Sequence, residues 1–158
     1  MTFDARAFRN ALGAFPTGVA VVTASGEGAP MGITVNSFSS VSLDPPLVMW
    51  CLERKSERFA VFANAPAFTI SVLGAEHEEV SARLAKPGEH RLNKLELVPT
   101  ELGPPALADA LAVFECERYA VHDGGDHAIL VGRVARFFRK DEGAPLVFFR
   151  GRYGALAD

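Results

Sequence analysis

Residues 18–35 read GVAVVTASGEGAPMGITV, in which two apolar runs rich in valine and threonine lie on either side of a glycine-containing turn. Residues 18–24 and 31–35 have the length and β-branched composition of strands. Residues 25–29, SGEGA, carry the small and glycine residues typical of a tight connection. We therefore expect an antiparallel hairpin near the start of the chain.

The rest of the chain repeats this alternation of short apolar runs and turns. The expected helices surround Phe8, Leu12 and Phe15, follow Ser56 and end before Pro66, and span residues 76–86. The further strands are expected at residues 47–53, 67–73, 112–116, 128–138 and 146–149. Pro45 and Pro46 indicate a break between elements, and residues 89–105 have the composition of a long surface loop.

Strands outnumber helices in this prediction, and hairpin turns replace the long crossovers that parallel sheets need. At least six strands with three short helices favour a mainly β fold, an antiparallel barrel in a single domain over residues 1–158. The sequence contains no GxGxxG motif, so a bound nucleotide would not be held as in a Rossmann fold.

Charge and composition exclude several classes of protein. The formal net charge is −3 with no long run of either sign, so nucleic acid is not an expected partner. The apolar runs are far shorter than a membrane span, and the N-terminus has no secretory pattern, so we expect no membrane partner and a cytoplasmic protein. Cys51 and Cys116 show neither metal nor redox spacing and are expected to be two buried thiols, with no metal site.

Residues 32–42, GITVNSFSSVS, contain six hydroxyl or amide side chains beside two apolar strands. An isoalloxazine ring has a polar rim and apolar faces, and therefore suits such a mixture. The polar candidates are Thr34, Asn36, Ser37, Ser40 and Ser42, and the apolar ones are Val35, Phe38 and Val41. A solvated edge strand with alternating Ser and Thr explains the same composition and stays open.

Residues 54–58, RKSER, lie at a strand end and the start of an expected helix, where cations, a hydroxyl and unpaired N–H groups favour an anion such as a flavin phosphate. A helix cap with solvated charges is the alternative. His127 follows a glycine turn at the mouth of a strand and is a candidate to meet a ligand, although an ordinary surface histidine fits equally.

The tail residues Arg152 and Tyr153, between two glycines, have the chemistry to stack on a ring or reach a phosphate, or form an ordinary basic strand end. Arg83 belongs to the same class of phosphate candidate. The sequence contains no Ser-His-Asp order, GxSxG elbow, HExxH motif or carboxylate pair. Hydride transfer between two stacked cofactors needs no protein nucleophile, so it is compatible with this absence.

Four stretches together resemble the flavin reductase-like FMN-binding split-barrel family, the small reductase components of two-component flavin-dependent monooxygenases. They are FPTGVAVVT at 15–23, GITVNSFSSVSLDPPL at 32–47, GDHAI at 125–129 and FRGRY at 149–153. The resemblance implies a split β-barrel and an NAD(P)H-dependent flavin reductase. FMN or FAD would be the flavin, NADH or NADPH the hydride donor, and a monooxygenase component the receiver of reduced flavin.

The resemblance also implies a homodimer with the flavin in a groove near the subunit interface. Thr34, Val35, Asn36 and Ser37, with Ser40, Val41 and Ser42, resemble the flavin-contacting segment. Lys55 and Ser56 resemble the phosphate end, with Arg83 beside them. His127 resembles the residue that meets the nicotinamide, and Arg152 and Tyr153 resemble residues of the same groove. The chain departs from the pattern at Glu57-Arg58, where relatives often have a threonine, and over residues 91–97.

Two rival functions stay open from the sequence. The first is a flavin- or haem-binding module of the same barrel that binds its ligand without turnover. The second is a flavoenzyme that retains its flavin and reduces another acceptor. The first predicts a bound chromophore without NAD(P)H oxidation, and the second predicts that flavin stays with the protein through gel filtration.

Overall fold

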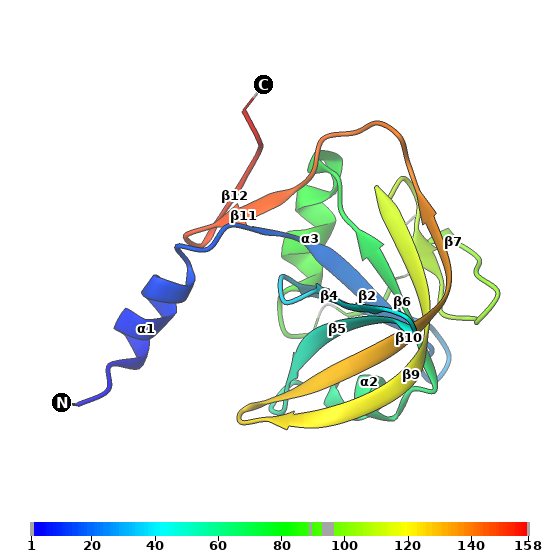
Figure 1. Cartoon of the computed structure of the whole chain (residues 1–158), viewed down its shortest axis with the longest axis horizontal. Coiled ribbons are helices and arrows are strands. Elements are labelled where there is room, and N and C mark those ends of the chain that lie inside the picture. The colour runs from blue at the N-terminus through cyan, green and yellow to red at the C-terminus, as the bar shows by residue number, and fades with distance from the viewer. Residues whose placement is uncertain (1, 89, 93–96, 158) are drawn as a thin grey trace.

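Seven antiparallel strands form one curved sheet in the part of the chain that the computed structural model describes, which is residues 2–88, 90–92 and 97–157 (Figure 1). Their order across the sheet is β3-β2-β6-β9-β10-β5-β4. The strands are β2 (Ala20–Ala24), β3 (Met31–Val35), β4 (Ser39–Leu43), β5 (Pro46–Glu53), β6 (Ala67–Val72), β9 (Ala112–Gly124) and β10 (His127–Arg139). Each of these pairings is antiparallel, which confirms the predicted fold class.

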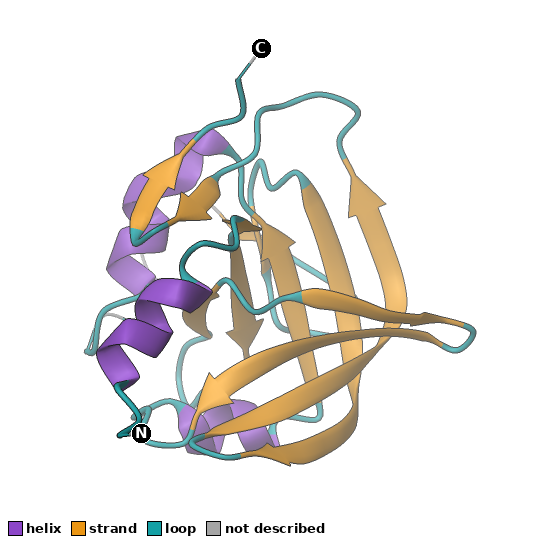
Figure 2. Ribbon diagram, turned by 60° about the vertical axis from the view of Figure 1, so that its left-hand side comes forward, coloured by secondary structure: helices purple, strands orange, loops and turns teal. Residues whose placement is uncertain are grey.

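The two edge strands of this sheet, β3 and β4, are neighbours in the sequence. The chain passes from one to the other through residues 36–38 alone, so the sheet curls until its two edges come together. Figure 2 shows this curvature. Among the described residues no ladder pairs β3 with β4. The barrel therefore has an open seam, which residues 36–38 cross.

Smaller elements flank the sheet. The helical ones are α1 (Ala5–Leu12), α2 (Phe59–Asn64), the 3-10 turn η1 (Ala75–His77) and α3 (Glu78–Leu84). The short strands are β1 (Thr17–Gly18), β7 (Leu97–Val98), β8 (Ala106–Leu107), β11 (Val147–Phe149) and β12 (Arg152–Gly154), which pair as β1-β11-β12 and β7-β8. The three predicted helices and the first hairpin are confirmed.

Several boundaries differ from the expectation. The apolar run 18–24 is divided between β1 and β2, because Gly18 pairs with Val147 whereas Ala20 begins the main sheet. The polar segment after β3 contains the exposed edge strand β4, as the alternative interpretation of its serines predicted. The tail adds β12, which the sequence did not predict. Within the expected loop 89–105, residues 89 and 93–96 lie outside the described residues, and Leu97–Val98 forms a strand.

The N-terminal helix α1 stands apart from the sheet (Figure 1). It begins after Asp4, whose Oδ1 accepts hydrogen bonds from the backbone N–H groups of Arg6 (2.9 Å) and Ala7 (3.1 Å), as an N-cap does. None of its residues is buried: Phe8 is 50% exposed and Leu12 59% exposed. The apolar face of α1 is therefore left uncovered by the described part of its own chain.

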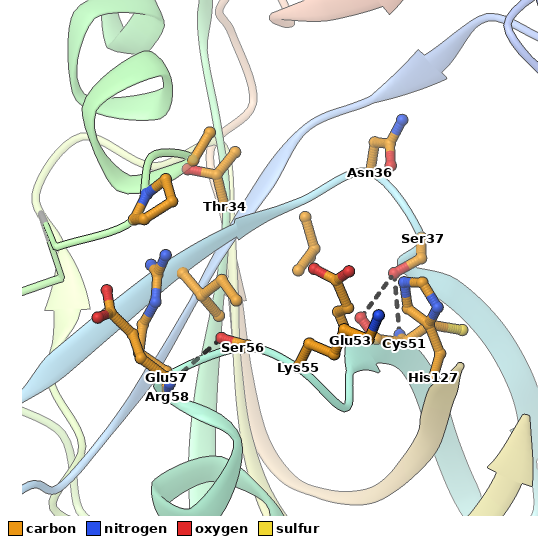
Figure 3. A pocket seen from close by; sticks show the side chains of 14 residues that line it. Thr34, Asn36, Ser37, Cys51, Glu53, Lys55, Ser56, Glu57, Arg58 and His127 are labelled. Carbon is orange, nitrogen blue, oxygen red and sulfur yellow. Dashed lines mark hydrogen bonds between the residues drawn. The ribbon is translucent and has the colours of Figure 1, made fainter. Parts of the chain in front are cut away.

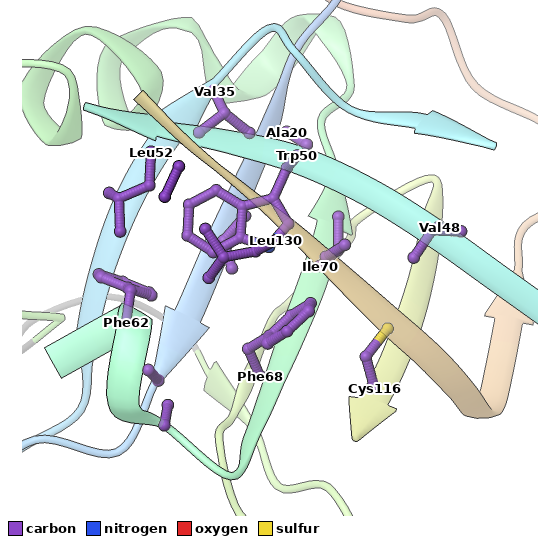
Figure 4. Close-up of a cluster of buried hydrophobic side chains, with 14 residues drawn as sticks. Ala20, Val35, Val48, Trp50, Leu52, Phe62, Phe68, Ile70, Cys116 and Leu130 are labelled. Carbon is purple, nitrogen blue, oxygen red and sulfur yellow. The ribbon is translucent and has the colours of Figure 1, made fainter. Parts of the chain in front are cut away.

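The main core fills the inside of the curved sheet (Figure 4). Trp50 of β5 is fully buried and packs edge-to-face on Phe62 of α2 (5.5 Å between ring centroids) and Phe68 of β6 (5.8 Å). Burial of each such ring contributes about 1.5–3 kcal/mol. A second cluster, which includes Leu73 and Leu84, packs α3 against the sheet and the C-terminal hairpin. These contacts fix the elements that surround the seam.

The two cysteines differ in their surroundings. Cys116 is buried, and this burial raises the pKa of its thiol to about 12. Cys51 is only partly buried, so the expectation of two buried thiols is wrong for this residue. Cys51 lies on the face of β5 that points away from Trp50, because side chains alternate along a strand. Separately, none of the helices formed by the described residues has the length and apolar character needed to cross a membrane.

Candidate functional site

A pocket of about 480 Å³ lies where the seam of the barrel meets the segment before α2. This volume is within the range of small-molecule sites. Four parts of the chain line it: β3 with the residues that follow it, the end of β5 through residue 58, the turn after α3 and the start of β10. The lining residues are Ile33, Thr34, Val35, Asn36, Ser37, Cys51, Glu53, Lys55, Ser56, Glu57, Arg58, Ala85, Pro87 and His127.

Seven residues that the sequence nominated share this pocket: Thr34, Val35, Asn36, Ser37, Lys55, Ser56 and His127. They come from three segments that are far apart in the sequence. Figure 3 shows two ends, with Ser37, Cys51 and His127 at one and Ser56, Glu57 and Arg58 at the other. The pocket therefore has two chemically different ends, as a site for an elongated ligand does.

Two of the nominated hydroxyls hold the pocket wall in place. The backbone N–H of Cys51 donates to Ser37 Oγ at 2.9 Å, and this hydroxyl lies 3.5 Å from the Cys51 carbonyl oxygen. The Thr34 hydroxyl donates to the carbonyl of Ser81 in α3 at 2.7 Å. These bonds attach residues 34–37 to β5 on one side and to α3 on the other. Ser37 and Thr34 thus position the segment that carries Asn36.

Asn36 differs from these two residues because its side chain is exposed. It lines the pocket described above and also a second pocket of about 500 Å³, which includes Phe15, Thr17 and Phe38. Its amide offers two donors and one acceptor. Within the described residues this amide makes no side-chain hydrogen bond, so it is available to a ligand on either side of the seam.

His127 is placed by the turn between β9 and β10. Gly125 adopts φ +75°, a left-handed conformation that glycine adopts without strain, and His127 opens β10 opposite Glu53 of β5. Arg54 ties this turn to β5: its backbone N–H donates to the Asp126 carbonyl at 2.9 Å, and its Nε donates to the Gly125 carbonyl at 3.1 Å. The end of β5 thereby holds the histidine at the mouth of the pocket.

The neighbouring carboxylate is coupled to this histidine. His127 Nδ1 lies 2.7 Å from Asp126 Oδ1. The hydrogen bond and the charge of His127 lower the pKa of Asp126, and the charge of Lys55 acts in the same direction. Asp126 itself is exposed, so solvent screens these effects. The contact fixes the orientation of the imidazole ring, whose Nε2 edge remains for a ligand.

Two cations line the pocket: Arg58 lies at the other end, whereas the side chain of Lys55 points toward Glu53 and Cys51 (Figure 3). Ser56 lies between them, and its Oγ accepts from the backbone N–H of Arg58 at 3.2 Å. The helix α2 that follows has six residues, too few for its dipole to hold an anion. The attraction for a phosphate at this end therefore comes from side chains, and the carboxylates of Glu53 and Glu57 lie in the same lining.

Six nominated residues lie outside the pocket lining. Ser40, Val41 and Ser42 are on the edge strand β4, and Val41 is 49% exposed. Arg83 reaches toward the Arg91 carbonyl at 3.5 Å, and Arg152 is exposed. Tyr153 turns toward α3, where its hydroxyl lies 2.7 Å from Ser81 Oγ. The single chain does not bring these residues to the pocket, and their contact with a cofactor stays a prediction.

The lining contains residues that the sequence analysis did not nominate. Cys51 and Glu53 alternate along β5 with the core residues Trp50 and Leu52. Because side chains of a strand point alternately to its two faces, this alternation could have placed Cys51 and Glu53 on the face away from the core. Ala85 and Pro87 reach the pocket only through the packing of the turn after α3 against Arg58, which belongs to the nominated run 54–58. No local pattern in the sequence indicates that contact.

Residues 12–157 match the family model described as "Flavin reductase like domain". The chain belongs to this family. It is similar to the FMN reductase (NADH) SmoA of Agrobacterium fabrum, with 48% identity over 98% of this chain and 87% of the relative. It is also similar to the reductase subunit HsaB of a flavin-dependent monooxygenase from Rhodococcus jostii, with 37% identity over 97% of this chain and 78% of the relative.

Solved structures of the family share the fold. The NADH:FAD oxidoreductase SgcE6 of Streptomyces globisporus, in complex with NAD and FAD fragments, superposes with a TM-score of 0.92 and 35% identity, over 99% of this chain and 97% of the other. The likeness confirms the predicted split barrel. It extends over the segments 33–37, 51–58, 85–87 and 127 that form the pocket, because it covers nearly the whole chain.

Proposed function

We propose that this protein is a flavin reductase that transfers a hydride from NADH to FMN and supplies the reduced flavin to a monooxygenase. The observation that carries the proposal is the pocket at the barrel seam, in a chain that belongs to the flavin reductase family. Its polar end with Asn36, Ser37 and His127 suits the rim of an isoalloxazine ring, and its other end with Ser56 and Arg58 suits a phosphate.

The protein's contribution to this reaction is binding and orientation. One hydride passes from the nicotinamide to the flavin, and a proton from solvent completes the reduced flavin, so the electrons balance without a protein nucleophile. Asn36 donates to the polar rim of the flavin, and residues 34–37 hold the ring in place through their attachment to β5 and α3. His127, fixed by Asp126, orients the nicotinamide at the mouth of the pocket.

The choice of NADH and FMN follows the name of SmoA, an FMN reductase that uses NADH and is 48% identical to this chain. The structural relative SgcE6 is named for NADH and FAD, so the assay below compares both flavins. A monooxygenase partner follows the name of HsaB, a reductase subunit of a flavin-dependent monooxygenase. Reduced flavin would leave the pocket and be bound by that partner.

We further propose a homodimer. The apolar face of α1 is uncovered within its own chain, and on the distal half of β10 Phe137 is 74% exposed and Phe138 60% exposed. Large exposed apolar groups on two separate elements favour association with another copy. Sedimentation equilibrium measures the mass directly, and a monomer at micromolar concentration would contradict this part of the proposal.

The test is anaerobic stopped-flow oxidation of NADH or NADPH by the purified protein, with FMN or FAD added separately. We expect rapid oxidation that depends on added flavin and is faster with NADH and FMN than with the other pairs. Flavin binding without nicotinamide oxidation would favour a binding module. Co-elution of reduced flavin with the protein through gel filtration would favour a flavoenzyme that retains its flavin.

A further inference from the structure

Arg58 is a buried cation at the edge of the pocket, with 5% of its surface exposed. Its guanidinium donates to three backbone carbonyls: Nη1 to Gly32 at 3.1 Å and to Leu84 at 2.8 Å, and Nη2 to Lys86 at 3.1 Å. These acceptors belong to β3, to the end of α3 and to the turn that follows it. One side chain therefore joins three elements that surround the pocket.

Glu57 makes a parallel connection to the same turn. Its Oε1 accepts a hydrogen bond from the backbone N–H of Gly88 and lies 3.6 Å from His90 Nδ1. We call Glu57 and Arg58, with their contacts to residues 84–90, the 57–58 clamp. The turn that the clamp holds carries Ala85 and Pro87, which line the pocket together with Ser56. The clamp thus sets the position of this part of the pocket wall.

The charge of Arg58 is only partly compensated. Its three acceptors are neutral carbonyls, and the adjacent Glu57 carboxylate is shared with Gly88 and His90. Burial lowers the pKa of Arg58, and the charge of Glu57 opposes this effect. Its Nε is buried and has no hydrogen-bond partner among the described residues. A buried cation in this state is stabilised by an anion bound nearby.

We infer that Arg58 is a positioning residue for the flavin phosphate: it fixes the wall of Ala85 and Pro87 and places a buried positive charge beside Ser56. The inference rests on the proposed function, because it takes the ligand of this pocket to be a flavin. The inference predicts that the pocket binds flavins with a phosphate monoester more tightly than riboflavin, which has the same ring and no phosphate. Contacts with the isoalloxazine ring cannot produce that preference, because FMN and riboflavin carry the same ring.

The experiment measures the Kd of FMN and of riboflavin by quenching of flavin fluorescence. The proteins compared are the wild type, Arg58→Met, Arg58→Lys and the control Arg118→Met. Arg118 also donates to a backbone carbonyl, that of Ala63 at 2.8 Å, but it is exposed and lies outside the pocket lining. It therefore reports the effect of losing a comparable hydrogen bond without a change at the pocket.

We expect the wild type to bind FMN at least about tenfold more tightly than riboflavin, because hydrogen bonds and charges at the Arg58 end of the pocket act on the phosphate. Arg58→Met should lose at least about tenfold in FMN affinity and less than about twofold in riboflavin affinity. Arg58→Lys keeps the charge without the three-carbonyl contact and should lose less FMN affinity than Arg58→Met. Arg118→Met should bind both flavins as the wild type does.

Equal loss of both flavins in Arg58→Met would overturn the inference, because it would show a role in general packing alone. Unchanged FMN affinity in Arg58→Met, or equal affinity of the wild type for the two flavins, would overturn it too. If Arg58→Met does not fold, Arg58→Lys decides: a selective loss of FMN affinity supports the inference and any other result contradicts it. Flavin-dependent NADH oxidation by the wild type tests the proposed function separately from all of these results.

Discussion

Asn36→Ala removes an exposed amide that makes no side-chain hydrogen bond within the described residues. We therefore expect the free energy of unfolding to change by no more than about 0.5 kcal/mol. Flavin binding should weaken, because the amide can make one or two hydrogen bonds to the polar rim of the ring. At about 1 kcal/mol for each net hydrogen bond, the Kd rises about fivefold for one bond and about thirtyfold for two.

Ser37→Ala provides the contrast at the neighbouring position. Its Oγ accepts from the Cys51 backbone N–H at 2.9 Å, so the substitution leaves that partly buried N–H without its partner. We expect the free energy of unfolding to fall by about 1–3 kcal/mol. Urea unfolding measures the stability of each variant, and titration of FMN against flavin fluorescence measures its affinity.

Asn36 and Ser37 differ in their contacts: the Asn36 amide is available to a ligand, whereas the Ser37 hydroxyl is bonded to the backbone of Cys51. The prediction for Asn36 would be refuted if Asn36→Ala bound FMN and riboflavin as tightly as the wild type, since the pocket would then have another ligand or orientation. An equal loss of stability in Asn36→Ala and Ser37→Ala would also refute it, because the amide would then be part of the scaffold.

Three further predictions follow from the same site. His127→Ala should slow anaerobic NADH oxidation by at least about tenfold with little change in Tm, and an unchanged rate and KM would remove its role. Because His127 lowers the pKa of Asp126, the stability that this carboxylate contributes is complete above its ordinary pKa and is lost as the pH falls through the lower folded value. Asp126→Asn should therefore flatten the acid side of the unfolding curve below about pH 4, measured by pH-dependent unfolding. Iodoacetamide at neutral pH should alkylate Cys51 and spare the buried Cys116, and FMN should protect Cys51; mass spectrometry that found equal labelling with and without FMN would count against the flavin site.

The sequence predicted the parts of the fold that local chemistry controls. Residues 31–35 form a strand, as their β-branched side chains after a glycine turn predicted. For β4 the sequence left two interpretations open, a ligand-contacting segment and a solvated edge strand, and the structure shows an exposed edge strand. The sequence did not predict β12, which pairs with β11 across the Arg150-Gly151 turn.

The candidate site divides in the same way. The residues on continuous motifs, such as Asn36 and His127, reach the pocket as expected. In the sequence Arg58 is one charge of the run 54–58. Its role in the pocket wall could not be predicted, because its three carbonyl partners belong to the distant residues 32, 84 and 86. In the described chain the Tyr153 hydroxyl lies 2.7 Å from Ser81 Oγ, a contact that the sequence did not indicate, and its contact with a cofactor stays a prediction. Contacts between distant segments carry no periodicity that a single sequence can reveal.

The strand order has a consequence for the moment at which this protein becomes able to bind a ligand. β5 pairs in the sheet with β4 and β10, and β10 in turn connects it through β9 to the strands made earlier. The residues before 127 therefore form two separate groups of strands, β3-β2-β6-β9 and β5-β4, and only β10 joins them into one sheet. Flavin capture is then a late event of folding, and a bound flavin reports that the whole sheet has been completed.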